Sequence, residues 1–333
     1  MKPRPKHPFF TAAPVILAFV LLGGVEDARA EDGVVRIAFA GDIMLDTLPG
    51  EDIAAGHDPF AGFGSVLDAA DIRIGNLECV VATTGTAVDK PFTFRAHPRV
   101  LSVLRRHFTA VSLANNHTGD FGHAAFLQQL DLLKSRKLFC FGGGRNVSEA
   151  RTPLVLTRNG LRIAFLGYND FKPREFEAGP EWPGVAWAVD EQIAADIKAA
   201  RTRHRADIVI PFMHWGWEHE KTSSRQRKLA HLMIDNGADL VVGSHPHVTQ
   251  GAEYYKGRLI AYSLGNFLFD GFTTPEANIG WVLRLTLTKS GLQEWDTVVA
   301  QIDARGRPHV VRNVESPCGK AGSPKVMKHT AVP

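Results

Sequence analysis

The sequence predicts an α/β protein with a largely buried sheet. Short apolar runs recur along the chain, and between them lie longer segments whose apolar residues are spaced three or four positions apart. The first pattern is typical of buried strands, and the second is typical of amphipathic helices that cover a sheet. With 333 residues, of which 44% are hydrophobic, and with no evident repeat or linker, the chain has the composition of one large globular domain.

The individual elements follow from these two patterns in chain order. Gly237 ends the last amphipathic segment as a helix stop, and Arg158-Asn159-Gly160 between two apolar runs is typical of a hairpin turn. After Gly280, two alternating segments predict closing antiparallel strands. The predicted strands are VVRIAFA (34–40), DIRIGN (71–76), TAVSLA (109–114), LRIAFLGY (161–168), DIVIPFM (207–213), DLVVG (239–243), RLIAYSLG (258–265) and the segments 281–290 and 293–311; the predicted helices lie in 97–108, 123–137, 190–204 and 223–237.

The first 30 residues predict a secretory signal peptide. Three basic residues precede an apolar run that ends near Val25, and the small residues Ala28 and Ala30 follow, as a signal peptidase requires. The alternative is an uncleaved membrane anchor, because the run approaches the roughly 17 to 25 residues of a membrane span. We therefore expect a protein secreted across the inner membrane, periplasmic or extracellular, and attached to the membrane only if the signal stays uncleaved.

The basic residues gather partly at the two chain ends and form no stripe along a predicted helix. With a net charge of +3, this distribution predicts no nucleic-acid partner. The segment 317–333 is rich in glycine, proline and lysine and predicts a flexible tail, which leaves 31–316 as the folded domain. Three cysteines, Cys79, Cys140 and Cys318, allow at most one disulfide, whose pairing the sequence leaves open.

Polar residues able to bind metals follow five of the predicted strands. In open α/β sheets, ligands bind in the crevice outside the carboxyl ends of the strands, so these residues are expected to converge. The two imidazoles around Pro246 are the most telling, because such close histidines suit a shared ion. The residues are Asp42, Glu78, Asn115, Asn116, His117, His214, His245 and His247.

This set of side chains predicts bound divalent metal ions, one or two per chain. Carboxylate oxygens, an amide oxygen and imidazole nitrogens suit Mn, Fe or Zn and need no thiolate. So many ligands exceed the needs of a single zinc. Two metals about 3.5 to 4 Å apart would lower the pKa of a bridging water and hold the attacking and leaving oxygens of a displacement at phosphorus.

Six motifs in this order resemble the CapA family of capsule synthesis proteins, associated with bacterial poly-gamma-glutamate. The resemblance covers residues from about 34 to 272. It implies the calcineurin-like metallophosphatase fold, a two-sheet αββα sandwich with a dinuclear metal centre between the sheets. The motifs are GDIML (41–45), ADIRIGNLE (70–78), VSLANNHTGDFG (111–122), HWGWE (214–218), GADLVVGSHPHVTQGAE (237–253) and YSLGNFLFD (262–270).

The resemblance also implies a role for each residue of the site. Asp42 and His247 would bind the first metal, Glu78 would take the place of the bridging carboxylate, and Asn116, His214 and His245 would bind the second metal. His117 resembles the histidine that protonates the leaving group. Asn115, Glu218 and Asn266 are expected to lie next to the metal ligands and to orient them through hydrogen bonds.

Two positions depart from the general superfamily pattern. Met44 stands where a histidine ligand is usual, and Glu78 stands where aspartate is usual. A thioether is a poor ligand for hard divalent ions, so the first metal is expected to be held less firmly.

Two functions from different classes remain open on the sequence alone. The first is an exported metal-dependent hydrolase acting on a phosphoester or a cell-surface polymer linkage. The second is a non-catalytic accessory or polymer-binding component of poly-gamma-glutamate synthesis, export or anchoring, in contact with the capsule synthesis machinery. Turnover of a generic phosphodiester by the metal-loaded protein discriminates between them.

Overall fold

A computed structural model describes residues 33–323 and 325–330, which belong to one unit, Asp32–Pro333. The predicted signal peptide, residues 1–30, lies outside the described residues. Within the described part of the chain, no helix is long and apolar enough to cross a membrane.

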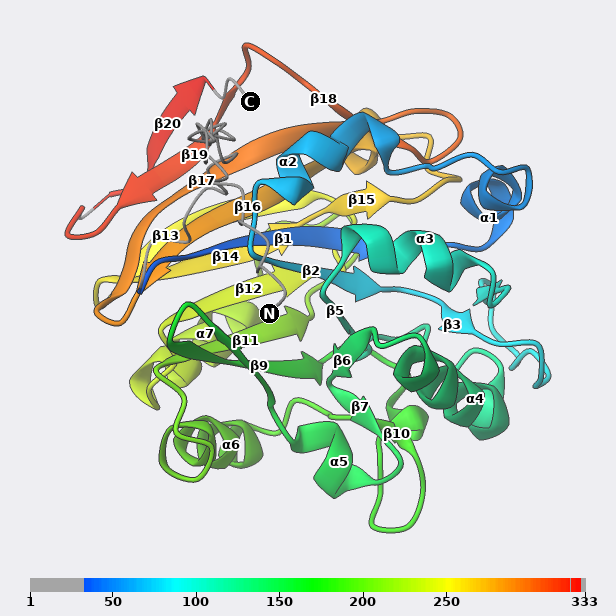
Figure 1. Cartoon of the computed structure of the whole chain (residues 1–333). Coiled ribbons are helices and arrows are strands. Elements are labelled where there is room, and N and C mark those ends of the chain that lie inside the picture. The colour runs from blue at the N-terminus through cyan, green and yellow to red at the C-terminus, as the bar shows by residue number, and fades with distance from the viewer. Residues whose placement is uncertain (1–32, 324, 331–333) are drawn as a thin grey trace, which may run out of the picture. The chain divides into compact units, whose positions relative to one another are not determined.

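The larger of two main sheets combines early and late parts of the chain (Figure 1). Its strands are β1 (Val35–Ile43), β2 (Ile72–Leu77), β5 (Ala110–Ser112), β6 (Phe139–Phe141), β15 (Asn266–Leu268), β16 (Ile279–Thr288), β17 (Gly291–Ile302), β18 (Pro308–Val310), β19 (Glu315–Lys320) and β20 (Met327–Thr330). The order is β20-β19-β17-β16-β1-β2-β5-β6, with β15 beside β1 and β18 beside β17. β1, β2, β5 and β6 are parallel, and β16 joins β1 in antiparallel register.

The second sheet is formed by the middle of the chain. Its strands are β8 (Leu154–Arg158), β9 (Leu161–Asn169), β11 (Ile208–His214), β12 (Leu240–Ser244), β13 (Thr249–Tyr255) and β14 (Arg258–Leu264). They lie in the order β13-β14-β12-β11-β9-β8, with four parallel central strands and antiparallel edges. Two short pairs complete the strands: β3 (Val80–Val81) with β4 (Arg95–Ala96), and β7 (Gly143–Gly144) with β10 (Gly184–Val185).

The helices cover the outer faces of both sheets (Figure 1). α1 to α4 share an apolar cluster with the outer face of the larger sheet, and α5 to α7 share another with the outer face of the second sheet. The predicted αββα sandwich is therefore confirmed. The helices are α1 (Thr47–Ala54), α2 (Gly64–Asp68), α3 (Val100–His107), α4 (Gly122–Ser135), α5 (Val147–Arg151), α6 (Asp190–Thr202) and α7 (Ser224–Asp235), with short 3-10 turns at Ala61–Phe63, Arg174–Phe176 and Pro275–Asn278.

A third apolar cluster lies between the two sheets and joins them. Phe39 of β1 contacts Phe165 of β9 and Phe212 of β11, with ring centroids 6.0 and 5.6 Å apart. Both sheets are thus buried on two faces, which explains why their parallel strands are continuous apolar runs.

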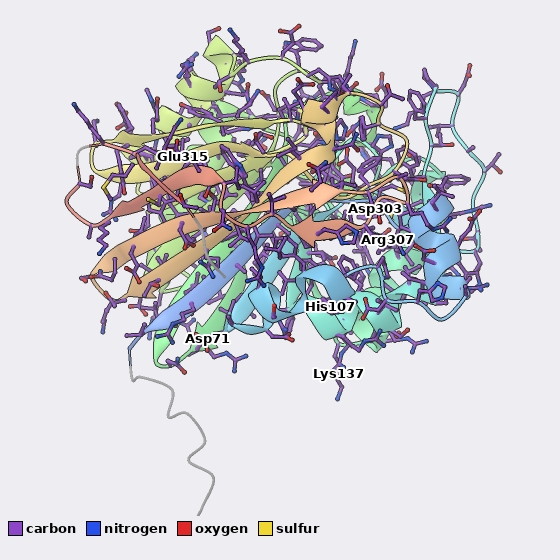
Figure 2. The ribbon with its side chains drawn as sticks, turned by 90° about the horizontal axis from the view of Figure 1, so that it is seen from above. Asp71, His107, Lys137, Asp303, Arg307 and Glu315 are labelled. Carbon is purple, nitrogen blue, oxygen red and sulfur yellow. The ribbon has the colours of Figure 1, made fainter. Side chains whose placement is uncertain are left out.

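Several local predictions are confirmed by the backbone. Asn159 and Gly160 both have positive φ, as the turn between β8 and β9 requires, and Gly237 after α7 has a φ of 107°. The buried His107 lies on α3 (Figure 2). Its Nε2 is 2.8 Å from a carboxylate oxygen of Asp58.

The structure corrects the prediction of a flexible tail from residue 317. β19 pairs with β17, and β20 pairs with β19, so sheet structure continues to Thr330. The Ser316 hydroxyl also donates to the Thr297 carbonyl at 2.8 Å. Just before these strands, the turn after β17 is fixed by an ion pair between Asp303 and Arg307 at 2.9 Å (Figure 2). The composition of this segment does not reveal its strands. They form through backbone hydrogen bonds to a neighbouring strand, which do not require apolar side chains.

All three cysteines are free thiols in this structure. Burial raises the pKa of the Cys79 thiol, and it raises that of Cys140 to about 12. Neither is therefore a reactive thiolate at neutral pH.

Candidate metal centre

The carboxyl ends of five strands meet between the two sheets and bring the predicted polar residues together. Asp42 lies in β1, Glu78 directly follows β2 and Asn116 follows β5 in the larger sheet, while His214 ends β11 and His245 follows β12 in the second sheet. His247 lies two residues further, before β13. The ligand atoms of the histidines and carboxylates fall into groups within 4.8 Å of one another.

Asp42 is held in place by a close approach of two backbone segments. A Cβ atom on Gly41 would lie 1.8 Å from the carbonyl oxygen of Gly265, so only glycine fits at position 41. The Asp42 N–H donates to that same oxygen at 3.1 Å. Its carboxylate accepts hydrogen bonds from the Asn76 amide at 2.8 Å and from the His245 N–H at 3.2 Å. The carboxylate therefore has a fixed orientation.

Glu78 is fully buried and occupies the middle of the cluster. Its Oε1 has no hydrogen-bond partner in the part of the chain that the structure describes, and it lies 3.7 Å from the Nε2 atoms of both His214 and His247. Burial, and then the neighbouring Asp42 carboxylate, raise the pKa of Glu78 well above its ordinary value. Two buried carboxylates so close together are unfavourable unless a cation compensates them.

His245 gives the clearest sign that an ion belongs here. Both of its ring nitrogens are buried and neither has a hydrogen-bond partner in the described structure, a state that costs free energy unless a ligand is bound. Its backbone φ is 100°, which is strained for a residue other than glycine. Burial, and then the charge of His247, lower its pKa well below the ordinary value, so the imidazole is neutral and able to bind a metal.

His214 and Asn116 face each other across the cluster. His214 Nε2 lies 2.7 Å from Asn116 Oδ1, and the Asn76 amide nitrogen lies 3.2 Å from His214 Nδ1. Because that amide can only donate, Nδ1 accepts and Nε2 carries the hydrogen. A metal held by both residues would replace this hydrogen.

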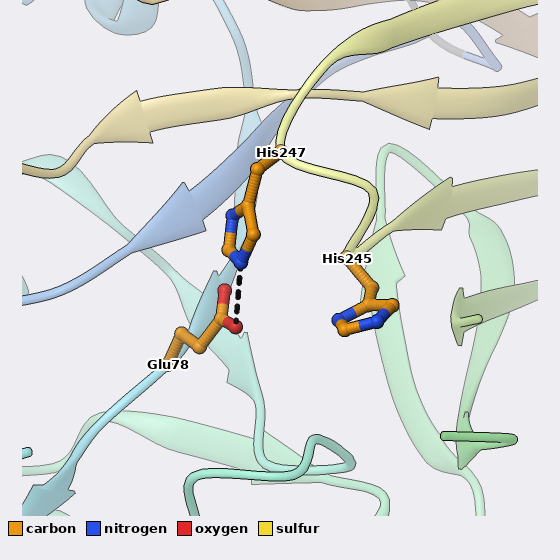
Figure 3. Close-up of side chains that lie close together, drawn as sticks. All are labelled: Glu78, His245 and His247. Atoms are coloured by element: carbon orange, nitrogen blue, oxygen red, sulfur yellow. Dashed lines mark ion pairs between the residues drawn. The ribbon is translucent and has the colours of Figure 1, made fainter. Parts of the chain in front are cut away.

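The His247 imidazole forms a hydrogen bond with Asn266. His247 Nδ1 lies 2.8 Å from Asn266 Oδ1, while the Asn266 amide nitrogen donates to the Ala277 carbonyl at 2.9 Å. The Asn266 oxygen therefore faces the ring, so Nδ1 carries the hydrogen. His247 Nε2 is left as an acceptor and points toward Glu78 (Figure 3).

The residues fit a pair of divalent ions. The first group of ligand atoms belongs to Glu78, His245 and His247, and the second to Asp42, Glu78 and His214. Glu78 is common to both groups, as a bridging carboxylate would be. The His245 ring lies close to both other histidines, with its centroid 4.5 Å from that of His214 and 5.8 Å from that of His247, so either pairing of these ligands is compatible with the distances. Metal binding itself stays a prediction.

Replacing Asn266 by alanine is expected to weaken metal binding by about 10- to 100-fold, the usual effect of losing a group that orients a ligand imidazole. His247 would remain but could rotate and change tautomer. Calorimetric titration of Zn²⁺ or Mn²⁺ into the metal-free protein measures the change, with Asn278→Ala as the matched control. An unchanged affinity in folded Asn266→Ala would show that His247 is not a ligand.

His117 lies at the rim of the cluster in a separate hydrogen-bonded pair. Its Nδ1 lies 2.7 Å from Asp120 Oδ2, so this nitrogen donates and Nε2 is left available for a ligand. Burial lowers the pKa of His117, and the hydrogen bond to Asp120 partly opposes that shift. The pair is suited to a group that gains and loses a proton.

The other predicted supporting residues take different positions. Asn115 is buried and holds the loop after β5 in place. Its amide nitrogen donates to Asn76 Oδ1 and to the Leu77 carbonyl, and its amide oxygen accepts a hydrogen bond from the His117 N–H. Glu218 is exposed, and within residues 33–323 and 325–330 its carboxylate accepts no hydrogen bond from an imidazole. Met44 is 1% exposed, packs in the apolar cluster beneath the first helices, and its sulfur accepts from the Asp46 N–H at 3.1 Å.

Three residues of the site were not among those predicted. Asn76 ends the apolar run of β2, so its position at a strand end was a signal that could have found it. Asp120 lies three residues after His117 in the same motif and could have been found by that spacing. Lys90 comes from a long irregular loop, and no local sequence pattern identifies it.

The fold and this cluster define the class of the protein: an αββα sandwich with a buried centre of histidines and carboxylates at the carboxyl ends of its strands. Residues 36–271 match the family described as bacterial capsule synthesis protein PGA_cap, and the chain belongs to this family. The family suggested by the sequence motifs is thereby confirmed.

Individual relatives carry related names. The chain is 33% identical to the PGA biosynthesis protein CapA of Bacillus subtilis, over 89% of this chain and 81% of that protein. It is 37% identical to the capsule biosynthesis protein CapA of Bacillus anthracis, over 51% of this chain but only 42% of that protein. A phosphatase structure from Mycoplasma pneumoniae superposes with a TM-score of 0.46 at 13% identity, over 90% of this chain and 95% of that one.

Proposed function

We propose that this protein is an exported metal-dependent hydrolase of the capsule synthesis pathway, acting on a phosphoester or on a linkage in a cell-surface polymer such as poly-gamma-glutamate. The proposal rests mainly on His245. Among the described residues, neither of its buried ring nitrogens has a hydrogen-bond partner, and the same is true of the nearby Glu78 Oε1. A purely structural cluster would satisfy these atoms with hydrogen bonds.

In this proposal Asp42, Glu78, His214, His245 and His247, with the Asn116 amide oxygen, hold one or two ions of Mn, Fe or Zn. When bound, such ions act as Lewis acids toward the oxygens of the group being cleaved. Water attacks the centre being cleaved as the bond to the leaving oxygen breaks. His117, as an imidazolium, donates its Nε2 proton to that oxygen, and Asp120 stabilises the positive charge. The buried walls of the site exclude bulk water and strengthen these interactions.

The purified protein loaded with Mn²⁺, Fe²⁺ or Zn²⁺ is expected to hydrolyse a generic phosphodiester such as bis-p-nitrophenyl phosphate. Chelation should abolish the turnover, and restored metal should recover it. Elemental analysis of the same samples gives the number of ions per chain. A protein that binds its metals fully but turns over neither the phosphodiester nor poly-gamma-glutamate would refute the hydrolase proposal.

The second function, a non-catalytic accessory of poly-gamma-glutamate synthesis, is favoured by the name of one relative. The chain is 31% identical over 61% of its length to a Mycobacterium tuberculosis protein called a probable polyglutamine synthesis accessory protein. In that case the cluster would hold its metal for structure or polymer binding, and metal-loaded protein would bind the polymer without cleaving it.

Export is part of the proposal and rests on the sequence of residues 1–30. Three basic residues, an apolar run and the small residues Ala28 and Ala30 support cleavage before Glu31. The N-terminal sequence of protein recovered from cells tests this directly. An intact N-terminus in the membrane fraction would favour the anchor instead.

A further inference from the structure

We propose that Lys90 is a positioning residue, which fixes the tautomer and the direction of the His117 ring through Asp120. The inference rests on the proposed role of His117 as proton donor. Lys90 lies in the irregular segment 82–94 between β3 and β4, which is long for a connection in a compact domain and therefore calls for a functional reason.

The Lys90 ammonium group is held by several partners on one turn. It forms an ion pair with Asp120 Oδ1 and donates to the Asn116 carbonyl oxygen at 2.9 Å. Its nitrogen also lies 3.4 Å from His117 Nδ1, but both groups are donors, so the two are joined through Asp120 and not to each other. Its side chain is only 17% exposed. The ammonium group thus links the backbone of a predicted metal ligand to the carboxylate that orients the predicted proton donor.

The rest of the segment is fastened to the same turn. The Phe94 N–H donates to Asp120 Oδ2 at 2.7 Å, and the Val88 N–H donates to the Asp120 carbonyl at 2.9 Å. The Phe94 ring lies over His117, with centroids 4.6 Å apart. These contacts place Lys90 at a defined position, so its ion pair is not a chance surface contact.

The position of Asp120 explains why a cation is needed there. Its carboxylate is buried and accepts hydrogen bonds from both His117 and Phe94. Without Lys90, one carboxylate oxygen would face a buried space without a counter-charge, which is strongly unfavourable. The carboxylate would then rotate toward other partners, and this change removes the acceptor that keeps the hydrogen of His117 on Nδ1.

The test uses the neutral variant Lys90→Met, the charged variant Lys90→Arg and the control Lys289→Met, which alters an exposed lysine between β16 and β17. Nitrogen NMR of ¹⁵N-histidine-labelled, zinc-loaded protein reports which His117 nitrogen carries the hydrogen. We expect the Nδ1–H form in the parent, in Lys90→Arg and in Lys289→Met, and its loss in Lys90→Met. Metal content should stay the same in all four proteins. Should Lys90→Met fail to fold, Lys90→Gln provides a second neutral variant.

The kinetic result separates this inference from the proposed function. With an alkyl phosphodiester, whose leaving group needs a proton, Lys90→Met should lower kcat by about 10- to 100-fold, as for other groups that orient a functional imidazole, with KM unchanged. A parent-like His117 spectrum in the folded neutral variants would overturn the inference, whether or not the protein is an enzyme. A parent without turnover would refute the hydrolase, and the NMR result would still decide the role of Lys90.

Discussion

Replacing His245 by alanine is expected to remove most of the bound metal while leaving the metal-free protein folded. His245 contributes two buried nitrogens that make no hydrogen bond in the described structure. Its removal therefore breaks no protein hydrogen bond, and the remaining cost is the lost packing against Phe171, whose ring centroid lies 3.9 Å away. If His245 served only to stabilise the fold, the substitution would lower the free energy of unfolding of the metal-free protein, and the variant would still bind its metal.

The loss of metal binding can be measured as a smaller increase in the stability of the protein when metal is added. An ion present at 100 times its dissociation constant stabilises the folded state by about 2.7 kcal/mol. Thermal unfolding should show such an increment in the parent and little of it in His245→Ala. His57→Ala is the matched control, because the His57 side chain is 68% exposed. Full metal stoichiometry with an undiminished increment in His245→Ala would show that this residue is not a ligand.

The fold was predictable because both sheets are buried on two faces. Parallel strands of this kind are apolar runs, and the helices between them carry a regular apolar spacing, so both patterns are visible without a structure. Placement of the ligands followed from the same observation. A polar residue directly after a buried strand, such as Glu78 after β2 or His245 after β12, can only lie at the edge where strand ends meet.

The supporting residues could not be predicted in the same way because they depend on long-range contacts. Lys90 is brought to Asp120 by the path of an irregular loop, and the bond between Asn266 and His247 joins two different strand ends. β19 forms because β17 offers backbone partners, and β20 in turn pairs with β19 at the edge of the sheet, whatever their own composition. Comparing this sequence with the superfamily motif shows only that Met44 replaces a histidine. The structure adds that the Met44 sulfur accepts a hydrogen bond from the Asp46 amide.

Replacing His117 by alanine is expected to lower kcat by about 10² to 10⁴, the usual range for a general acid, and to leave metal content unchanged. The residue lies outside both groups of candidate ligand atoms. Its ring makes one short polar contact to a carboxylate, that of Asp120, at 2.7 Å. After the substitution, Lys90 and Asp120 still form their ion pair, so the loop and the metal ligands should stay in place.

The identity of the leaving group makes this prediction specific for proton donation. A nitrophenolate departs readily without a proton, whereas an alkoxide needs one, so the loss in His117→Ala should be much larger for an alkyl phosphodiester than for the nitrophenyl ester. A residue that only shapes the site would slow both substrates by the same factor. Equal losses for the two esters would therefore remove the proton-donor role, and a parallel loss of metal would make His117 a ligand instead, with Asp120 orienting its ring toward an ion.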